Sequence, residues 1–152
     1  MKSTIEKPEP RRPPVYTIWE EFCGWTFDRT AGIPKSQRFT FGQRIDETTL
    51  DVLLLVVRAI YSREKVALLD EANLKLEELR TLWRLVQKRG WISLQQLDYA
   101  SRTMDQAGRM LGGWRKQQAE KGSEGRAGPV DPPGSENRGA PGGRALPENR
   151  KP

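Results

Sequence analysis

The sequence predicts an all-α fold, an antiparallel four-helix bundle, on the strength of three observations. Apolar residues between positions 15 and 116 recur in steps of three and four, the period of an amphipathic helix. A single proline, Pro34, interrupts this stretch. Three of the four predicted helices are about 26 residues long, or roughly 40 Å, and short connections join them. Helices of matched length with short connections pack side by side in alternating directions.

The first helix is predicted over residues 15–29, after which Pro34 breaks the pattern. The second is predicted from Ser36, a suitable N-cap residue, to Tyr61. Its large aliphatic side chains wrap most of its circumference, whereas a helix on the surface of a bundle needs one apolar stripe. These side chains are Leu50, Val52, Leu53, Leu54, Leu55, Val56, Val57 and Ile60.

The surplus apolar surface of this second helix needs a partner, because a four-helix bundle has no central helix to bury. We therefore expect the bundles to assemble into a ring-shaped homo-oligomer. The predicted interface residues are Leu50, Leu53, Leu54 and Val57. The alternative is that this helix is buried more deeply within its own monomer.

The third helix is predicted over residues 63–89 and ends at Gly90, a residue suited to a left-handed C-terminal turn. The fourth is predicted over residues 93–116, opening with a capping box between Ser93 and Gln96. The seam of the third helix is Leu69, Ala72, Leu76, Leu79, Trp83 and Val86, and that of the fourth is Leu97, Ala100, Met104, Ala107, Leu111 and Trp114.

The two ends of the chain differ from this centre in composition. Residues 1–14 hold four prolines and four Lys or Arg residues, and we expect a flexible N-terminal arm there. Residues 117–152 hold six prolines and seven glycines but few large apolar side chains, which predicts a disordered C-terminal tail. The folded domain is thus predicted over residues 15–116. No stretch is long and apolar enough for a signal peptide or a membrane span, so we expect a cytoplasmic protein.

The residue types present argue against catalysis. The sequence contains no histidine, which excludes histidine-ligated metal sites and catalytic triads, and we expect no metal and no cofactor. The single cysteine, Cys23, excludes an internal disulfide and lies among aromatic residues, where a small buried apolar role is expected. No glycine-rich phosphate-binding motif occurs. We predict that the protein is not an enzyme.

The positively charged residues form a clearer pattern than any candidate catalytic residues, and the net charge of the chain is +6. Three groups could follow a phosphate backbone, because they form stripes or lie in segments without acidic residues. They are Arg80, Arg84 and Lys88 on the third helix; Arg102, Arg109 and Lys116 on the fourth; and Lys35, Arg38 and Arg44 around the start of the second. Charged helix faces also keep bundles soluble, and from one chain the two interpretations stand equal.

Several stretches of this sequence resemble a known family. They are Pro34–Gly42 (PKSQRFTFG), 51–55 (DVLLL), 61–65 (YSREK), 72–80 (ANLKLEELR) and 108–114 (GRMLGGW). The chain is similar in them to the accessory variability determinant (Avd) proteins of diversity-generating retroelements, which belong to a wider four-helix-bundle family. That wider family includes proteins encoded in intervening sequences of 23S ribosomal RNA genes. The likeness covers residues 15–116, which contain 16 Lys and Arg residues and 13 Asp and Glu residues.

The resemblance implies a barrel-shaped homopentamer with a basic outer surface. It also implies partners, namely the element's reverse transcriptase, RNA and possibly DNA, and a role in mutagenic cDNA synthesis in which the chemistry belongs to the reverse transcriptase. Two alternatives remain, a 23S intervening-sequence bundle protein of unestablished role and a protein-only oligomeric adapter. A neighbouring reverse transcriptase gene would distinguish the first, and a salt titration of RNA binding would distinguish the second.

Overall fold

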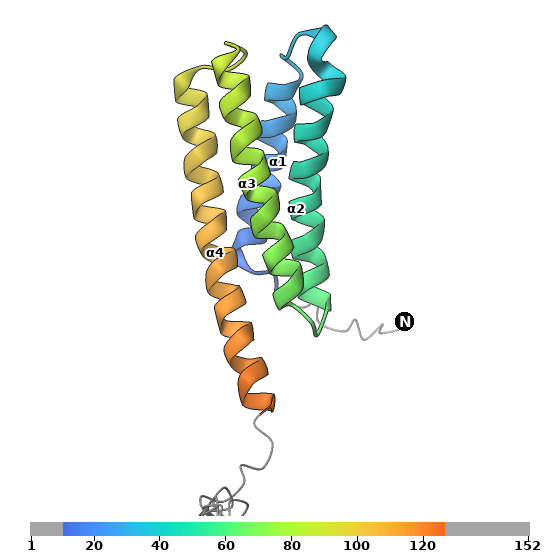
Figure 1. The fold of residues 1–152 in the computed structure, drawn as a ribbon, viewed down its shortest axis with the longest axis vertical. Helices are drawn as coiled ribbons and strands as arrows, with labels where there is room; N and C mark the ends of the chain where they lie inside the picture. Colours follow the sequence, from blue (N-terminus) through green and yellow to red (C-terminus); the bar gives the residue numbers. More distant parts are fainter. Residues whose placement is uncertain (1–10, 127–152) are drawn as a thin grey trace, which may run out of the picture.

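The structure, a computed structural model, describes residues 11–126, and in that range it is all helical (Figure 1). The α-helices are α1 (Pro14–Thr30), α2 (Gln43–Tyr61), α3 (Val66–Lys88) and α4 (Leu94–Arg126). A 3₁₀ turn, η1 (Lys35–Gln37), and a π-helical turn, η2 (Arg38–Gly42), precede α2. The all-α prediction is confirmed. Residues 1–10 of the predicted arm and 127–152 of the predicted tail lie outside the described residues.

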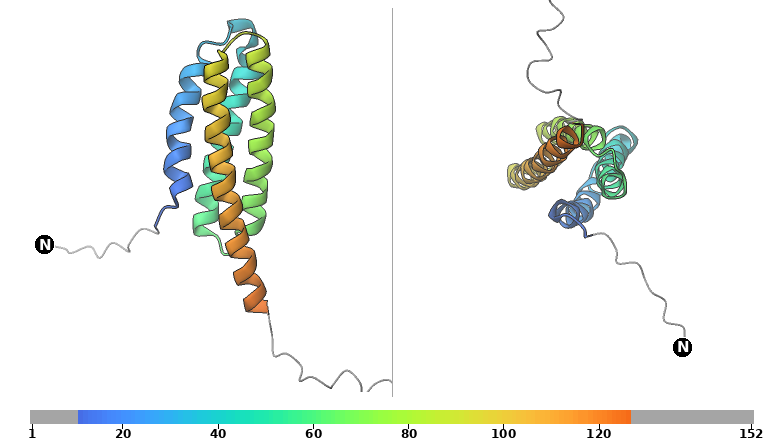
Figure 2. Two further views of the ribbon diagram at one scale, coloured as in Figure 1. Left: turned by 90° about the vertical axis from the view of Figure 1, so that its left-hand side faces the viewer. Right: turned by 90° about the horizontal axis from the view of Figure 1, so that it is seen from below.

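The four α-helices form an antiparallel bundle, as predicted. Neighbouring helices run in alternating directions, with α2 packed between α1 and α3, and α4 closing the bundle against α3 and α1 (Figures 1 and 2). The connection between α1 and α2 and the turn between α3 and α4 therefore lie at the same end of the bundle. At the other end, α4 extends past the rest of the bundle.

Large aromatic side chains fill the core between α1, α2 and α3. Trp19, Phe22 and Trp83 are fully buried, and each such side chain contributes about 1.5 to 3 kcal/mol through its burial. The indole Nε1 of Trp19 donates a 2.8 Å hydrogen bond to the backbone oxygen of Thr49, which ties α1 to α2. The predicted seams of α3 and α4 also lie in the core, except that Leu97 and Trp114 are half-buried at its edge.

The predicted stop and start between α3 and α4 are both confirmed. Gly90 has a φ of 78°, and the amides of Gly90 and Trp91 donate to the backbone oxygens of Gln87 and Val86, the bonding pattern of a Schellman motif. Ser93 and Gln96 then form the reciprocal capping box. The backbone N–H of Gln96 donates to Ser93 Oγ at 3.1 Å, and the backbone N–H of Ser93 donates to the side-chain Oε1 of Gln96 at 2.9 Å.

The start of α2 differs from the prediction. Ser36 forms no cap, because it lies in η1 and the regular helix begins only at Gln43. The large apolar side chains before Gln43 are Phe39 and Phe41, and two residues two positions apart cannot share one helical face. Periodicity therefore gives no register for this segment. In the structure a π-helical turn leaves Phe41 half-buried against the core and Phe39 exposed.

Two other helix boundaries also differ. The third helix starts at Val66. The side chain of Lys65, the residue before it, points back toward α2, and its Nζ donates to the backbone oxygens of Ala59, Ile60 and Ser62 at the end of that helix. The fourth helix ends at Arg126 rather than near residue 116. Its additional turns contain Gln, Ala, Glu and Lys, which favour helix, whereas the prolines that shaped the prediction begin only at residue 129.

Candidate nucleic-acid interface

Two basic segments that are far apart in the sequence meet at one end of the bundle. The rings of Phe41, in η2, and Trp91, in the turn after α3, pack edge to face with centroids 5.4 Å apart. This contact places the segment before α2 beside the C-terminal end of α3. Neither segment contains an acidic residue, since none occurs at positions 29–45 or 79–91. Positive charges that lie together on one surface, with no acidic residue in either segment, attract phosphate groups.

We call the cations of these two segments the basic end. They are Lys35, Arg38, Arg44, Arg84, Lys88 and Arg89, all exposed. The guanidinium of Arg89 lies 5.6 Å from the ring centroid of Trp91, and Arg38 Nη2 donates to the backbone oxygen of Ala31 at 3.3 Å. Among residues 11–123, no carboxylate forms an ion pair with any of the six. Sequence reasoning did not select Arg89, although the acid-free run around it was visible.

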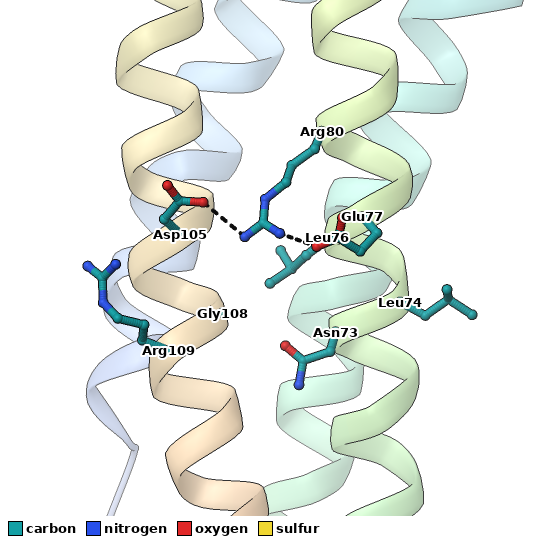
Figure 3. Close-up of a pocket in the computed structure, with 8 residues that line it drawn as sticks. All are labelled: Asn73, Leu74, Leu76, Glu77, Arg80, Asp105, Gly108 and Arg109. Atoms are coloured by element: carbon teal, nitrogen blue, oxygen red, sulfur yellow. Dashed lines mark hydrogen bonds and ion pairs between the residues drawn. The ribbon is translucent and has the colours of Figure 1, made fainter.

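Arg80 differs from the other predicted cations because it is already paired within the bundle. It forms ion pairs with Glu77 on α3 and, at 3.1 Å, with Asp105 on α4 (Figure 3). Its Nη2 also lies 3.4 Å from the backbone oxygen of Met104. Gly108 leaves room for this arrangement, since a Cβ atom there would lie 3.3 Å from Arg80 Nη2. Arg80 is thus placed to hold α3 against α4, while Arg84 and Lys88 continue the same stripe unpaired within residues 11–123.

The predicted cations of α4 form a separate line along its outer face. Arg102, Arg109 and Lys116 are all exposed. Arg102 is partly neutralised by Asp98, whose carboxylate lies 3.0 Å from it. Arg109 lines the groove between α3 and α4 but points away from Arg80 (Figure 3). The structure therefore does not bring the three predicted groups into one patch, because the α4 line extends down the bundle away from the basic end.

The predicted interface residues on α2 divide into two kinds. Leu50 and Leu54 are 40% and 54% exposed, whereas Leu53 and Val57 are half-buried, Leu53 against the core. Tyr61 extends the exposed row by two turns, and we call Leu50, Leu54 and Tyr61 the α2 stripe. Sequence reasoning missed Tyr61, although its spacing of seven from Leu54 was visible. An exposed apolar row of this kind is typical of a surface that binds another protein.

The single cysteine is not set up for nucleophilic chemistry. Cys23 is buried, and this burial raises the pKa of its thiol to about 11, so the thiolate is scarce at neutral pH. Within the described residues, no three His, Cys, Asp or Glu side chains come together in a way that could hold a metal ion. The helices of the described part include none with the length and apolarity to cross a membrane.

A protein-family model described as bAvd-like matches residues 15–118. The chain belongs to the bAvd-like family. The match agrees with the resemblance stated above and includes every predicted cation and every predicted residue of the interface on α2. The bAvd-like family is an accessory-protein family, so the chain is identified with proteins that assist rather than catalyse. A search of curated proteins gives no match.

Proposed function

We propose that this bAvd-like protein is the non-catalytic accessory protein of a diversity-generating retroelement. In this role it assembles into a ring-shaped homo-oligomer, a pentamer by its family likeness. It binds the element's RNA together with the reverse transcriptase and thereby supports mutagenic cDNA synthesis. The family match over residues 15–118 carries the proposal.

Two features of the surface support it. The basic end gathers six cations with no ion-paired carboxylate among residues 11–123, which suits contact with phosphates. The α2 stripe provides an exposed apolar row for contact between protomers. A ring would repeat the basic end once per protomer and strengthen the field that attracts RNA.

RNA binding is tested by filter binding of the full chain over a range of salt concentrations. Phosphate contacts require the logarithm of the affinity to fall linearly with the logarithm of the salt concentration. Replacing Arg84 and Lys88 together by Glu should weaken binding and flatten this slope by about one unit per lost contact. The matched control is reversal of Arg63 and Lys121, two exposed cations near the opposite end of the bundle, which changes the net charge equally.

Arg80 is left unchanged in this test because its loss would disturb the packing of α3 on α4. If both double reversals weaken binding equally, the attraction comes from the overall charge and the basic end has no special role. If the unaltered protein binds no RNA at any salt concentration, the protein-only adapter replaces the proposal. The reverse transcriptase partnership is tested by co-purification with the reverse transcriptase of the same retroelement.

A further inference from the structure

A pocket of about 430 Å³ lies where the end of α1 meets η2 and the start of α2. Its apolar lining comes from Phe27, Phe39 and Leu50. Asp46 and Glu47 add carboxylates to the same pocket. Aromatic faces beside hydrogen-bond acceptors are not needed for contact with phosphates alone, so this pocket calls for a more specific occupant.

Phe39 is the most unusual member of this lining. It is 85% exposed, more than any other large apolar side chain in the described residues. The π-helical turn presents it outward, while Phe41 in the same turn packs on Trp91. Turns of this kind are rare and are often found at functional sites. An aromatic ring presented in this way offers a flat face to a planar ligand.

The carboxylates of the pocket have acceptor capacity to spare. Asp46 Oδ1 accepts a 2.7 Å hydrogen bond from Thr30 Oγ1, and Glu47 Oε1 accepts a 2.8 Å bond from Gln43 Nε2. The second oxygen of each carboxylate has no hydrogen bond or ion pair among residues 11–123. Carboxylate oxygens accept hydrogen bonds from the N–H groups on the edges of nucleobases.

One cation lines the pocket, Arg38 in η2. Arg44, at the start of α2, lies instead in a separate hollow with Lys75 and Glu78 of α3. The pocket thus combines two carboxylate acceptors with one exposed cation, which suits a base placed inward with a phosphate beside Arg38. Leu50 also belongs to the α2 stripe, so a neighbouring protomer is the competing occupant of these walls. An apolar side chain of that protomer would leave Arg38 and the two carboxylates without a new partner.

We infer that this pocket takes one unpaired nucleobase of bound RNA, stacked on Phe39. In this arrangement Asp46 and Glu47 accept hydrogen bonds from the base, and Arg38 contacts a flanking phosphate. The inference rests on the proposed RNA binding and adds a preference to it. RNA with unpaired bases binds more tightly than a duplex of the same length, because the bases of a duplex are already stacked and cannot enter the pocket.

The test measures binding of the full chain to a single-stranded RNA and to a duplex RNA of equal length. Replacing Phe39 by Ala should weaken binding of the single strand about ten-fold and leave binding of the duplex unchanged. Phe39→Trp should retain the affinity, whereas Phe39→Leu should lose it, because stacking needs an aromatic face. A single strand carrying 2-aminopurine should lose fluorescence on binding the unaltered protein and less on binding Phe39→Ala.

Leu74→Ala is the matched control, since Leu74 is a large apolar side chain 61% exposed on α3, outside this pocket. It should change neither affinity. If the unaltered protein binds both RNAs equally and Phe39→Ala changes neither affinity, the base pocket is wrong, but the proposed RNA binding still stands. Absence of binding to either RNA would overturn both. If Phe39→Ala instead lowers the oligomer mass and Phe39→Leu restores it, the pocket is a protein contact and the inference is wrong.

Discussion

At the scale of single residues, the contact between α3 and α4 depends on a glycine that makes room for an arginine. Arg80 reaches across to Asp105 and toward the backbone oxygen of Met104 past Gly108, which has no side chain to crowd the guanidinium. A charged group used in this way is a packing element, and its partners hold it in one place. The neighbouring Gly113 has no atom within 4 Å of the position that a Cβ would occupy.

This difference between the two glycines predicts different effects of alanine. Gly113→Ala should raise the stability of the protein by about 1 kcal/mol, the gain expected for Ala over Gly inside a helix. Gly108→Ala should gain less, because its Cβ would lie 3.3 Å from Arg80 Nη2 and the guanidinium must shift to relieve this close contact. Urea unfolding of both variants measures the difference. Equal gains would show that Arg80 moves aside freely and contributes little.

Asp46 predicts a dependence of stability on pH. Desolvation by burial raises its pKa above the ordinary 3.8, although the hydrogen bond from Thr30 opposes this shift. The folded state therefore holds the proton more tightly, so this group stabilises the fold below pH 3.8 and loses that contribution as the pH rises through its raised pKa. Asp46→Asn keeps an acceptor for Thr30 without the charge.

The Asp46→Asn variant should accordingly melt at a higher temperature than the parent at neutral pH. The difference should shrink as the pH falls toward and below 3.8, where Asp46 is protonated. Thermal unfolding of both proteins across this range measures it. A difference in melting temperature that stays constant with pH would mean that ionisation of Asp46 does not affect the fold.

At the scale of elements, the last turns of α4 extend beyond the rest of the bundle. Gln118, Ala119, Gly122 and Ser123 line a pocket with the connection between α2 and α3. Of these four residues, Gln118 and Ala119 are half-buried, whereas residues 121–123 are exposed. The burial that anchors the end of α4 therefore comes from residues before 121, because Gly122 and Ser123 line the same hollow without being buried in it.

Deleting residues 121–152 should therefore leave the melting temperature nearly unchanged, with a loss of ellipticity limited to the final turns of α4. A deletion that begins at residue 117 should lower the melting temperature clearly, because it removes Gln118 and Ala119. Circular dichroism of the two truncated chains during heating provides the comparison. A large drop for the shorter deletion would show that residues beyond 120 pack on the bundle.

At the scale of the whole molecule, the bundle carries an exposed apolar row on α2 and exposed cations on its basic end and α4. The α2 stripe is nonpolar, and Leu54 is 54% exposed in a single protomer. A second protomer that covers the stripe would remove this apolar surface from water and so lower the tendency to aggregate. Light scattering should then report an assembly several times 17.4 kDa, with a five-fold mass as the expected value.

Leu54→Glu should reduce this mass and leave the helical content unchanged, because a buried charge at the interface would be unpaired. Leu74→Glu is the control, since Leu74 is equally large and 61% exposed on α3. It should keep the parent mass. A monomer at micromolar concentration for the unaltered chain would refute the ring, and an unchanged mass for Leu54→Glu would place the interface elsewhere.

The sequence by itself determined the class of fold, the packing faces of the helices and one of the turns. Periods of three and four, Gly90 and the Ser93–Gln96 pair act within a few residues, so their effect can be derived without knowing what packs against them. The same local character explains the failures at Ser36 and at the end of α4, where no periodic apolar face set the boundary.

Only the tertiary structure decided which cations are free and where they meet. In the sequence, Arg80 belongs to the same stripe as Arg84 and Lys88, and nothing there distinguishes it from them. Its ion pair with Asp105 depends on the register of α3 against α4. The joining of the two basic segments likewise depends on Phe41 reaching Trp91, 50 positions away in the chain. Contacts between distant residues are set by how whole helices pack, and no pattern within one helix contains that information.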